Sequence, residues 1–138
     1  MPNYFLGVAG SKELSRSDIT EAFWCVPSIA TIDDIILLYC PRSVDDKRQG
    51  VFAEARISRA PSANDQNNSR CSGYGLLYVP IEVQRRFLSP VTAKDMKSDP
   101  VLKTASFIRR NFQGTSFQLQ EASYKRILAL GEKKKAGT

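Results

Sequence analysis

Few residues of this chain carry the chemistry of a functional site. The only tryptophan, Trp24, is followed at once by Cys25 and then by Pro27, which forbids a continuing helix. A break in regular structure frees backbone amides and carbonyls, which can then bind a ligand. Taken alone, a lone tryptophan at such a place favours a core residue that packs a helix against a sheet.

Catalytic and metal-binding residues are scarce. The chain has no histidine and three cysteines, at positions 25, 40 and 71. Without histidine, neither Cys25 nor a serine has the usual base that activates a nucleophile. The odd number and irregular spacing of the cysteines match no zinc motif. We therefore expect a protein without catalytic residues, bound metal or cofactor, whose cysteines are reduced.

Charge is distributed unevenly along the chain. Up to Asp46 there are three basic and seven acidic residues, whereas from Lys47 onward there are seventeen basic and seven acidic residues. The formal net charge is +6. This asymmetry favours a polyanionic partner, most simply nucleic acid, and the alternative is a basic surface without such a partner. The longest apolar run, residues 35–40, is too short to span a bilayer, so we expect a cytoplasmic protein without membrane contact.

The 138 residues suit one domain, over 1–131, followed by a basic solvated tail or the start of a linker over 132–138. Residue patterns predict strands and helices along the domain. Strands are expected over 4–9, 34–40, 51–58, 76–83 and 117–119, and helices over 15–23, from 92, from 99 and over 120–130, with Gly131 as the last C-cap.

Three of these strands carry further expectations. The uniformly apolar strand 34–40 should be central in a sheet, and strand 51–58, with its alternating pattern, should have one solvated face. Pro80 indicates a bulge or an edge position for its strand. The order of elements is not the alternation of a doubly wound fold. It predicts an α+β domain with a curved, mostly antiparallel sheet or small barrel flanked by short helices.

Several short strings together resemble EVE domains and the related YTH domains of the PUA-like superfamily. They are YFL at 4–6, FWC at 23–25, DIILLY at 34–39, GVFAEA at 50–55, MKSDPVLK at 96–103 and FQGTSFQL at 112–119. Two places depart from the EVE pattern: GVAGSKE at 7–13 replaces an aromatic-Leu-Met-Lys-Ser-Glu-Pro string, and WCVPS at 24–28 is closer to the YTH form. The resemblance covers nearly the whole chain in element order and implies a PUA-like fold.

The resemblance also implies a pocket for a single flipped, chemically modified base. Trp24 is then one wall, because stacking of a base on an aromatic face is worth about 1–3 kcal/mol. Backbone groups of Cys25 and Ser11 are expected to bind the base edge, and Tyr74, in the long polar loop 60–75, is the candidate second wall. The alternatives are a core role for Trp24 and packing on a strand for Tyr74.

Phosphate contacts follow from the same resemblance. Arg109, Arg110 and Asn111, together with Arg70 in the polar loop, are expected to bind phosphates beside the flipped nucleotide. Guanidinium groups suit this role because they form paired hydrogen bonds with phosphate oxygens. The alternative for Arg109 and Arg110 is capping of a helix C-terminus, and the two roles are compatible.

The predicted function is a nucleic-acid-binding module that reads a modified base. The first choice is 5-methylcytosine or 5-hydroxymethylcytosine in DNA, in the manner of a specificity domain of a modification-dependent restriction system. N6-methyladenine and a modified RNA are alternatives. No residue set here cleaves a phosphodiester, so a nuclease would be a separate partner or a fused effector. A nucleic-acid-processing enzyme of a neighbouring PUA-like branch and a protein-interaction module are alternatives of other classes.

Overall fold

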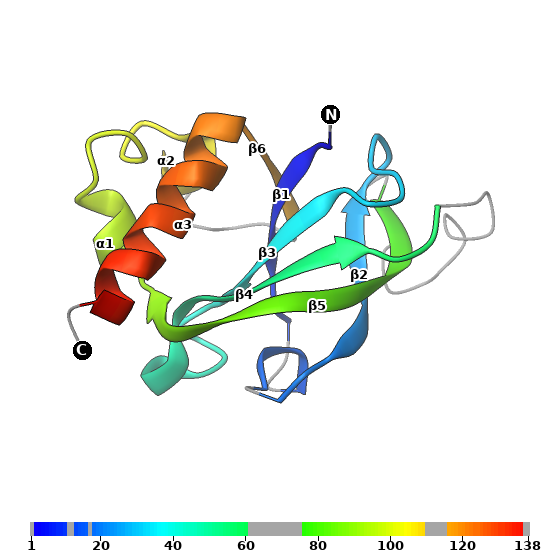
Figure 1. Cartoon of the computed structure of the whole chain (residues 1–138), viewed down its shortest axis with the longest axis horizontal. Coiled ribbons are helices and arrows are strands. Elements are labelled where there is room, and N and C mark those ends of the chain that lie inside the picture. Colours follow the sequence, from blue (N-terminus) through cyan, green and yellow to red (C-terminus); the bar gives the residue numbers. More distant parts are fainter. Residues whose placement is uncertain (1, 11–12, 17, 61–75, 110–115, 137–138) are drawn as a thin grey trace.

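The computed structural model describes residues 2–10, 13–16, 18–60, 76–109 and 116–136. These residues form a curled six-stranded sheet with helices packed against one side (Figure 1). The strands are β1 (Tyr4–Val8), β2 (Glu21–Pro27), β3 (Ile35–Cys40), β4 (Gly50–Ile57), β5 (Leu76–Val91) and β6 (Ser116–Leu119). The helices are α1 (Ala93–Lys97), α2 (Ser106–Arg109) and α3 (Glu121–Ala136), with short 3-10 helices at Glu13–Ser15 and Asp46–Arg48.

The strand order is β2-β5-β4-β3-β1-β6. β1 and β3 run parallel, whereas the other neighbouring pairs are antiparallel. The edge strands β2 and β6 approach each other because the sheet curls. The predicted α+β class, with a curved and mostly antiparallel sheet, is confirmed.

Two hydrophobic cores lie on opposite faces of this sheet. The barrel core, inside the curl, includes Phe5, Trp24, Val26, Ile36, Leu38, Ile57, Val79 and Ile81. The helix core, beneath the helices, includes Leu6, Leu37, Tyr39, Met96, Leu102, Phe107, Phe117 and Ile127. Successive side chains of a strand point to opposite faces, so β3 supplies both cores. This explains its uniformly apolar sequence and confirms its predicted central position.

β4 departs from the predicted half-solvated strand. Its residues are buried on both faces, apart from a partly exposed Arg56. Small residues such as Ala53 and Ala55 face the barrel core, and Glu54 is only 9% exposed because it lies on the face that helix α3 covers. The alternating pattern was therefore produced by two buried faces of different polarity, and the predicted solvated face is wrong.

The predicted helix over residues 15–23 is also wrong. Residues 13–15 form a 3-10 turn, and residues 21–27 form β2, which pairs with β5 from Glu21 opposite Glu82 to Pro27 opposite Leu76. Trp24 and Val26 face the barrel core. Long-range pairing and burial of these side chains outweigh the local capping signal of Ser15 and Asp18, because propensity is a weak determinant beside tertiary contacts.

β5 is longer than predicted and lies inside the sheet, between β2 and β4. Pro80 is therefore not on an edge strand. The irregular register between β4 and β5 falls between Val51 and Ala53 and between Glu54 and Ala55 on β4, and not at Pro80. The carbonyl of Pro80 accepts a hydrogen bond from the Ser58 amide at 3.1 Å, which ties the ends of the two strands together.

The predicted start positions of the helices agree with the structure better than the predicted end positions do. Thr92 and Asp95 form the expected capping box of α1. Asp99 caps the next segment as expected, although residues 100–105 form turns and the helix is confined to α2. Gly131 does not end the last helix: a Cβ there would lie 2.9 Å from Cε2 of Phe87, so glycine allows α3 to pack closely on β5. The helix continues to Ala136, where a solvated tail was expected.

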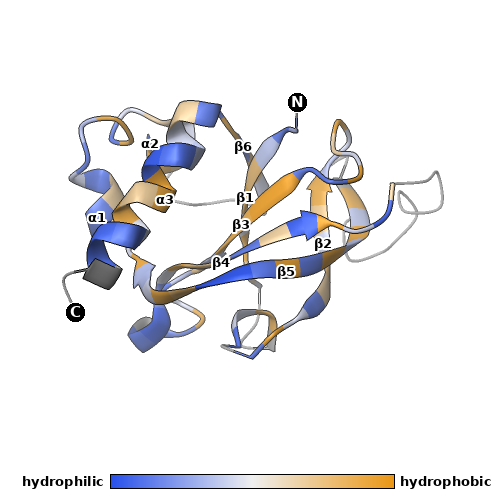
Figure 2. Ribbon diagram, in the orientation of Figure 1, coloured by the Kyte–Doolittle hydropathy of each residue, from blue (hydrophilic) through white to orange (hydrophobic). Residues whose placement is uncertain are grey.

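Hydrophilic residues cover the outer side of the helices and much of β5 (Figure 2). Within the described part of the chain, no helix is both long enough and apolar enough to cross a lipid bilayer.

Candidate nucleic-acid interface

Trp24 lies inside the barrel core and is 2% exposed. Its indole packs edge-on against β1, where a Cβ atom at Gly7 would overlap Nε1 of Trp24 and lie 3.0 Å from Cδ1. The same atom would lie 3.1 Å from Cγ2 of Ile36. Gly7 is therefore the residue on β1 that leaves room for the indole. Sequence reasoning did not identify Gly7, because only the fold brings β1 and β2 together.

A second unexpected feature lies beside Gly7. Ser116, the first residue of β6, is directly opposite Gly7 in the antiparallel pairing of β1 and β6. Side chains of directly opposed residues lie on the same face of a sheet. The Ser116 hydroxyl is buried and has no hydrogen-bond partner, the only such side-chain atom found among the described residues. A buried hydroxyl without a partner calls for an explanation, and a polar ligand group is one.

Cys25 points away from Trp24, because neighbouring side chains on a strand alternate between faces. It belongs to neither core and is disulfide-bonded. Cys40, by contrast, is a free, buried thiol. The expectation that the cysteines are reduced is therefore wrong for Cys25. Its side chain does not share a face with Trp24, so the contact predicted beside the indole concerns the Cys25 backbone alone.

The position of β2 in the sheet bears on the predicted role of its backbone. β2 is an edge strand of the described sheet and pairs with β5 on one side only. An edge strand leaves a row of amides and carbonyls unpaired. The sequence attributed accessible backbone groups to a break in the chain, whereas the structure places Trp24 and Cys25 in an edge strand.

Of the other predicted site residues, Arg109 alone lies within the described part of the chain. Arg109 is exposed at the end of α2, whose residues Phe107 and Ile108 pack in the helix core, on the opposite face of the sheet from Trp24. The remaining predictions lie outside the described residues: Ser11, Arg70, Tyr74, Arg110 and Asn111.

Two polar clusters on the helix side were not predicted. In the first, the Tyr124 hydroxyl donates a hydrogen bond to the buried Glu54, and the Tyr124 ring stacks on Tyr4 with centroids 4.3 Å apart. Burial raises the pKa of Tyr124, and the hydrogen bond to Glu54 raises it further. The only sequence signal was Glu54 itself, an acidic residue among the small and apolar residues of β4.

The second cluster surrounds Asp99, whose side chain is 2% exposed. Its carboxylate accepts hydrogen bonds from the amides of Val101 and Leu102 at 3.0 and 3.1 Å and from Nε of Arg126 at 2.6 Å. Burial alone would raise the pKa of Asp99, but these hydrogen bonds and the Arg126 charge hold it below its usual value of 3.8. The Asp-Pro pair signalled the cap but not the arginine, which is 27 residues away.

Metal ligands do not cluster among the described residues: no group of three or more Cys, Asp or Glu side chains there is arranged to hold an ion. The candidate site on the barrel side therefore consists of the Trp24 indole, the buried Ser116 hydroxyl and the edge strand β2.

No family model and no curated protein matches the sequence, but solved structures match it closely in shape. A hypothetical protein from Leishmania major is 18% identical, with a TM-score of 0.70 over 98% of both chains. A protein from Pseudomonas putida is 14% identical, with a TM-score of 0.71 over 93% of this chain and 99% of that chain. Human THYN1, solved in complex with DNA containing 5-methylcytosine, is 12% identical, with a TM-score of 0.67 over 94% of this chain and 98% of that chain.

The DUF55 domain of human thymocyte nuclear protein 1 matches similarly, with a TM-score of 0.66, 12% identity and coverage of 94% and 98% of the two chains. These similarities extend over nearly the full length of each protein, although few residues are shared. The chain therefore shares its fold with the DUF55 domain and with the other proteins named above, which agrees with the fold that its sequence motifs implied.

Proposed function

We propose that this protein binds nucleic acid and recognises a modified base, first 5-methylcytosine or 5-hydroxymethylcytosine in DNA, at Trp24. The observation that carries the proposal is the unpartnered buried hydroxyl of Ser116, opposite the glycine that accommodates the indole. Leaving such a group unpaired costs about 1–3 kcal/mol, which a ligand that bonds to it recovers. The fold shared with a human protein solved with 5-methylcytosine DNA supports this class of ligand.

Base binding must uncover the indole. Because Trp24 is 2% exposed, a flipped base stacks on it only after displacing the groups that cover it. The base edge then meets the Ser116 hydroxyl and the backbone at the edge of β2. The proposed pocket consists of Trp24, the backbone of Cys25, Ser11, Tyr74 and Ser116. The proposed phosphate contacts are Arg70, Arg109, Arg110 and Asn111.

The protein acts in this proposal as a reader and not as an enzyme. Its chain has no histidine, and the described residues hold no cluster of metal ligands. Any cleavage of the recognised nucleic acid falls to a nuclease partner or a fused effector. This arrangement, in which one module recognises the base and a separate nuclease cleaves, fits a specificity module of a modification-dependent restriction system.

The experiment uses Trp24, the only tryptophan, as its own reporter. Fluorescence is titrated with duplexes that differ only in carrying cytosine, 5-methylcytosine, 5-hydroxymethylcytosine or N6-methyladenine. We expect quenching that depends on the modification. Burial of one methyl group is worth about 0.8 kcal/mol, which corresponds to about fourfold tighter binding of the methylated duplex. Equal, weak quenching by all duplexes would contradict the proposal.

A matched variant separates a ligand role of Ser116 from a structural one. Ser116→Ala removes the unpartnered hydroxyl, so we expect the free energy of unfolding to stay level or rise by about 1 kcal/mol. Affinity for the preferred duplex should nevertheless fall, because the base loses a hydrogen bond. A variant that is less stable and binds equally well would assign Ser116 a structural role only.

The same panel distinguishes the alternatives. Preference for N6-methyladenine, or for a single-stranded modified RNA added to the panel, would change the ligand but keep the site. Chemical turnover of an oligonucleotide would indicate a PUA-like processing enzyme. Absence of any salt-dependent binding would indicate a protein-interaction module, because phosphate contacts make log affinity fall linearly with log salt concentration.

A further inference from the structure

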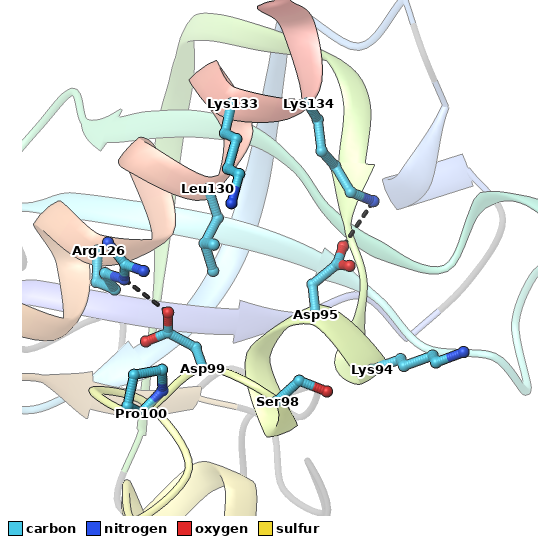
Figure 3. A pocket seen from close by; sticks show the side chains of 9 residues that line it. All are labelled: Lys94, Asp95, Ser98, Asp99, Pro100, Arg126, Leu130, Lys133 and Lys134. Carbon is cyan, nitrogen blue, oxygen red and sulfur yellow. Dashed lines mark hydrogen bonds and ion pairs between the residues drawn. The ribbon is translucent and has the colours of Figure 1, made fainter. Parts of the chain in front are cut away.

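A basic pocket lies on the helix side of the molecule, on the opposite face of the sheet from Trp24. It has a volume of about 620 Å³ and is formed by α1 with the turn that follows it and by α3 between Arg126 and Lys134 (Figure 3). Four cationic side chains line it, Lys94, Arg126, Lys133 and Lys134, together with the carboxylates Asp95 and Asp99. The lining therefore carries a net charge of +2.

The two carboxylates are already neutralised by partners in the pocket wall. Lys134 Nζ lies 2.6 Å from Asp95 Oδ2 and also donates to the carbonyl of Pro90 at 2.8 Å. Arg126 Nε lies 2.6 Å from Asp99 Oδ1. These contacts fix both carboxylates in the wall and leave the surplus positive charge on the remaining groups.

Arg126 is held in an orientation that leaves its terminal nitrogens available. It contacts Asp99 through Nε alone, and among the described residues its two terminal NH₂ groups have no acceptor. The Asp99 side chain is 2% exposed and is itself fixed by two backbone amides. A guanidinium anchored at Nε by a buried carboxylate loses little conformational freedom when its outer nitrogens bind an anion.

Two further donors, Lys133 and Ser98, also line the pocket. Lys133 descends from α3 beside Leu130, toward Asp99 and Ser98 on the opposite wall, whereas Lys94 extends away from α3 (Figure 3). Lys133 has no ion-pair partner within the described residues, and Ser98 is exposed. The Arg126 terminal groups, the Lys133 ammonium and the Ser98 hydroxyl thus form a set of free donors around one pocket.

We propose that this pocket binds a phosphate group through Arg126, Lys133 and Ser98. A phosphate matches the donor set better than a carboxylate, because it presents more acceptor oxygens and carries up to two negative charges. Because both carboxylates are paired, the Lys133 ammonium supplies an unpaired positive charge for the phosphate. The site is independent of base recognition at Trp24, and its phosphate comes from a nucleic-acid backbone or from a free phosphate or nucleotide.

The test titrates the whole protein with inorganic phosphate at constant ionic strength and follows backbone amide signals by NMR. We expect saturable shifts at Ser98, Arg126 and Lys133, and no saturable shift with acetate. Lys133→Gln and Arg126→Lys should each weaken binding about tenfold, as expected for loss of a hydrogen bond to a charged group. Arg126→Lys keeps a cation beside Asp99, so the protein is expected to remain folded.

Lys125→Gln is the matched control. Lys125 lies on the same helix and is 69% exposed, but it pairs with Glu121 at 3.3 Å and does not line the pocket. This variant should bind phosphate within about twofold of the wild type. Absence of saturable shifts in the wild type, or equal weakening by Lys125→Gln and Lys133→Gln, would overturn the proposal.

Two more titrations identify the source of the phosphate. If the site binds a nucleic-acid backbone, Lys133→Gln lowers the salt dependence of binding to an unmodified duplex by about 0.9 for the lost phosphate contact. If the source is a free phosphate or nucleotide, deoxycytidine monophosphate binds to the wild type and the duplex slope is unchanged. Base discrimination at Trp24 is measured separately, so failure of one proposal leaves the other intact.

Discussion

The two faces of the sheet bury polar groups in different ways. On the helix side, each buried carboxylate has a partner: Asp99 has two amides and Arg126, and Glu54 has the Tyr124 hydroxyl. On the barrel side, the indole of Trp24 is packed against Gly7, and the nearby Ser116 hydroxyl has no partner. An unpaired group that is buried is costly and favours a ligand, whereas an unpaired group at the surface is solvated.

This contrast separates two kinds of binding. On the barrel side, the proposed ligand is a neutral, aromatic group that enters an apolar interior and supplies one missing hydrogen bond. The helix side suits an anion, because its free donors are cationic and lie in an open pocket whose wall is already neutralised. The buried interactions on each side predict distinct consequences of mutation.

The largest expected effect is on the barrel side. Trp24→Ala should lower the free energy of unfolding by about 3–5 kcal/mol, because it removes a large buried ring and leaves a cavity. Urea denaturation measures this loss. Trp24→Phe, which keeps an aromatic ring, should lose less. A loss below about 1 kcal/mol for Trp24→Ala would show that the indole is not a core residue.

Crowding the indole from the other strand should have the next largest effect. Gly7→Ala places a Cβ against Nε1 of Trp24, so we expect a loss of about 1–3 kcal/mol in thermal or urea unfolding. Gly10→Ala is the matched control, because a Cβ at Gly10 meets no atom within 4 Å. Combining Gly7→Ala with Trp24→Phe should restore part of the loss, and strictly additive effects would argue against direct contact.

On the helix side, Tyr124→Phe should cost about 1–2 kcal/mol, because the buried Glu54 loses its hydrogen-bond donor. Tyr4→Phe is the control: it keeps the ring that stacks on Tyr124 and should change the unfolding free energy by less than about 0.5 kcal/mol. If the two variants are equally destabilised, stacking and not the hydrogen bond dominates this contact.

The smallest effect should depend on pH. The pKa of Asp99 is lower in the folded protein than its usual value of 3.8, so its ionised form stabilises the fold above that pH. This contribution is lost as the pH falls through the lowered folded pKa. Asp99→Asn should therefore cost about 1 kcal/mol at pH 6. The difference from wild type should shrink toward pH 3 in urea denaturation, and a constant difference would mean that Asp99 ionisation does not stabilise the fold.

Local patterns predicted some elements well. The apolar run 34–40 gave a central strand, and Thr92 with Asp95 gave a capping box, because both depend on residues close in sequence. The helix predicted over 15–23 failed because β2 is stabilised by pairing with β5, more than 50 residues away. Gly131 failed as a C-cap because its role is to allow close packing on Phe87.

The candidate sites also combine features that the sequence determines with features that only the tertiary structure determines. The sequence by itself determined the α+β class, the basic character of the chain, the lack of histidine and the motif order that implies an EVE-type fold. Only the tertiary structure decided that Trp24 is buried against Gly7, that Ser116 lies opposite Gly7, and that Asp99 orients Arg126. Composition and local motifs are properties of the chain, whereas burial and partnership arise when distant strands and helices meet.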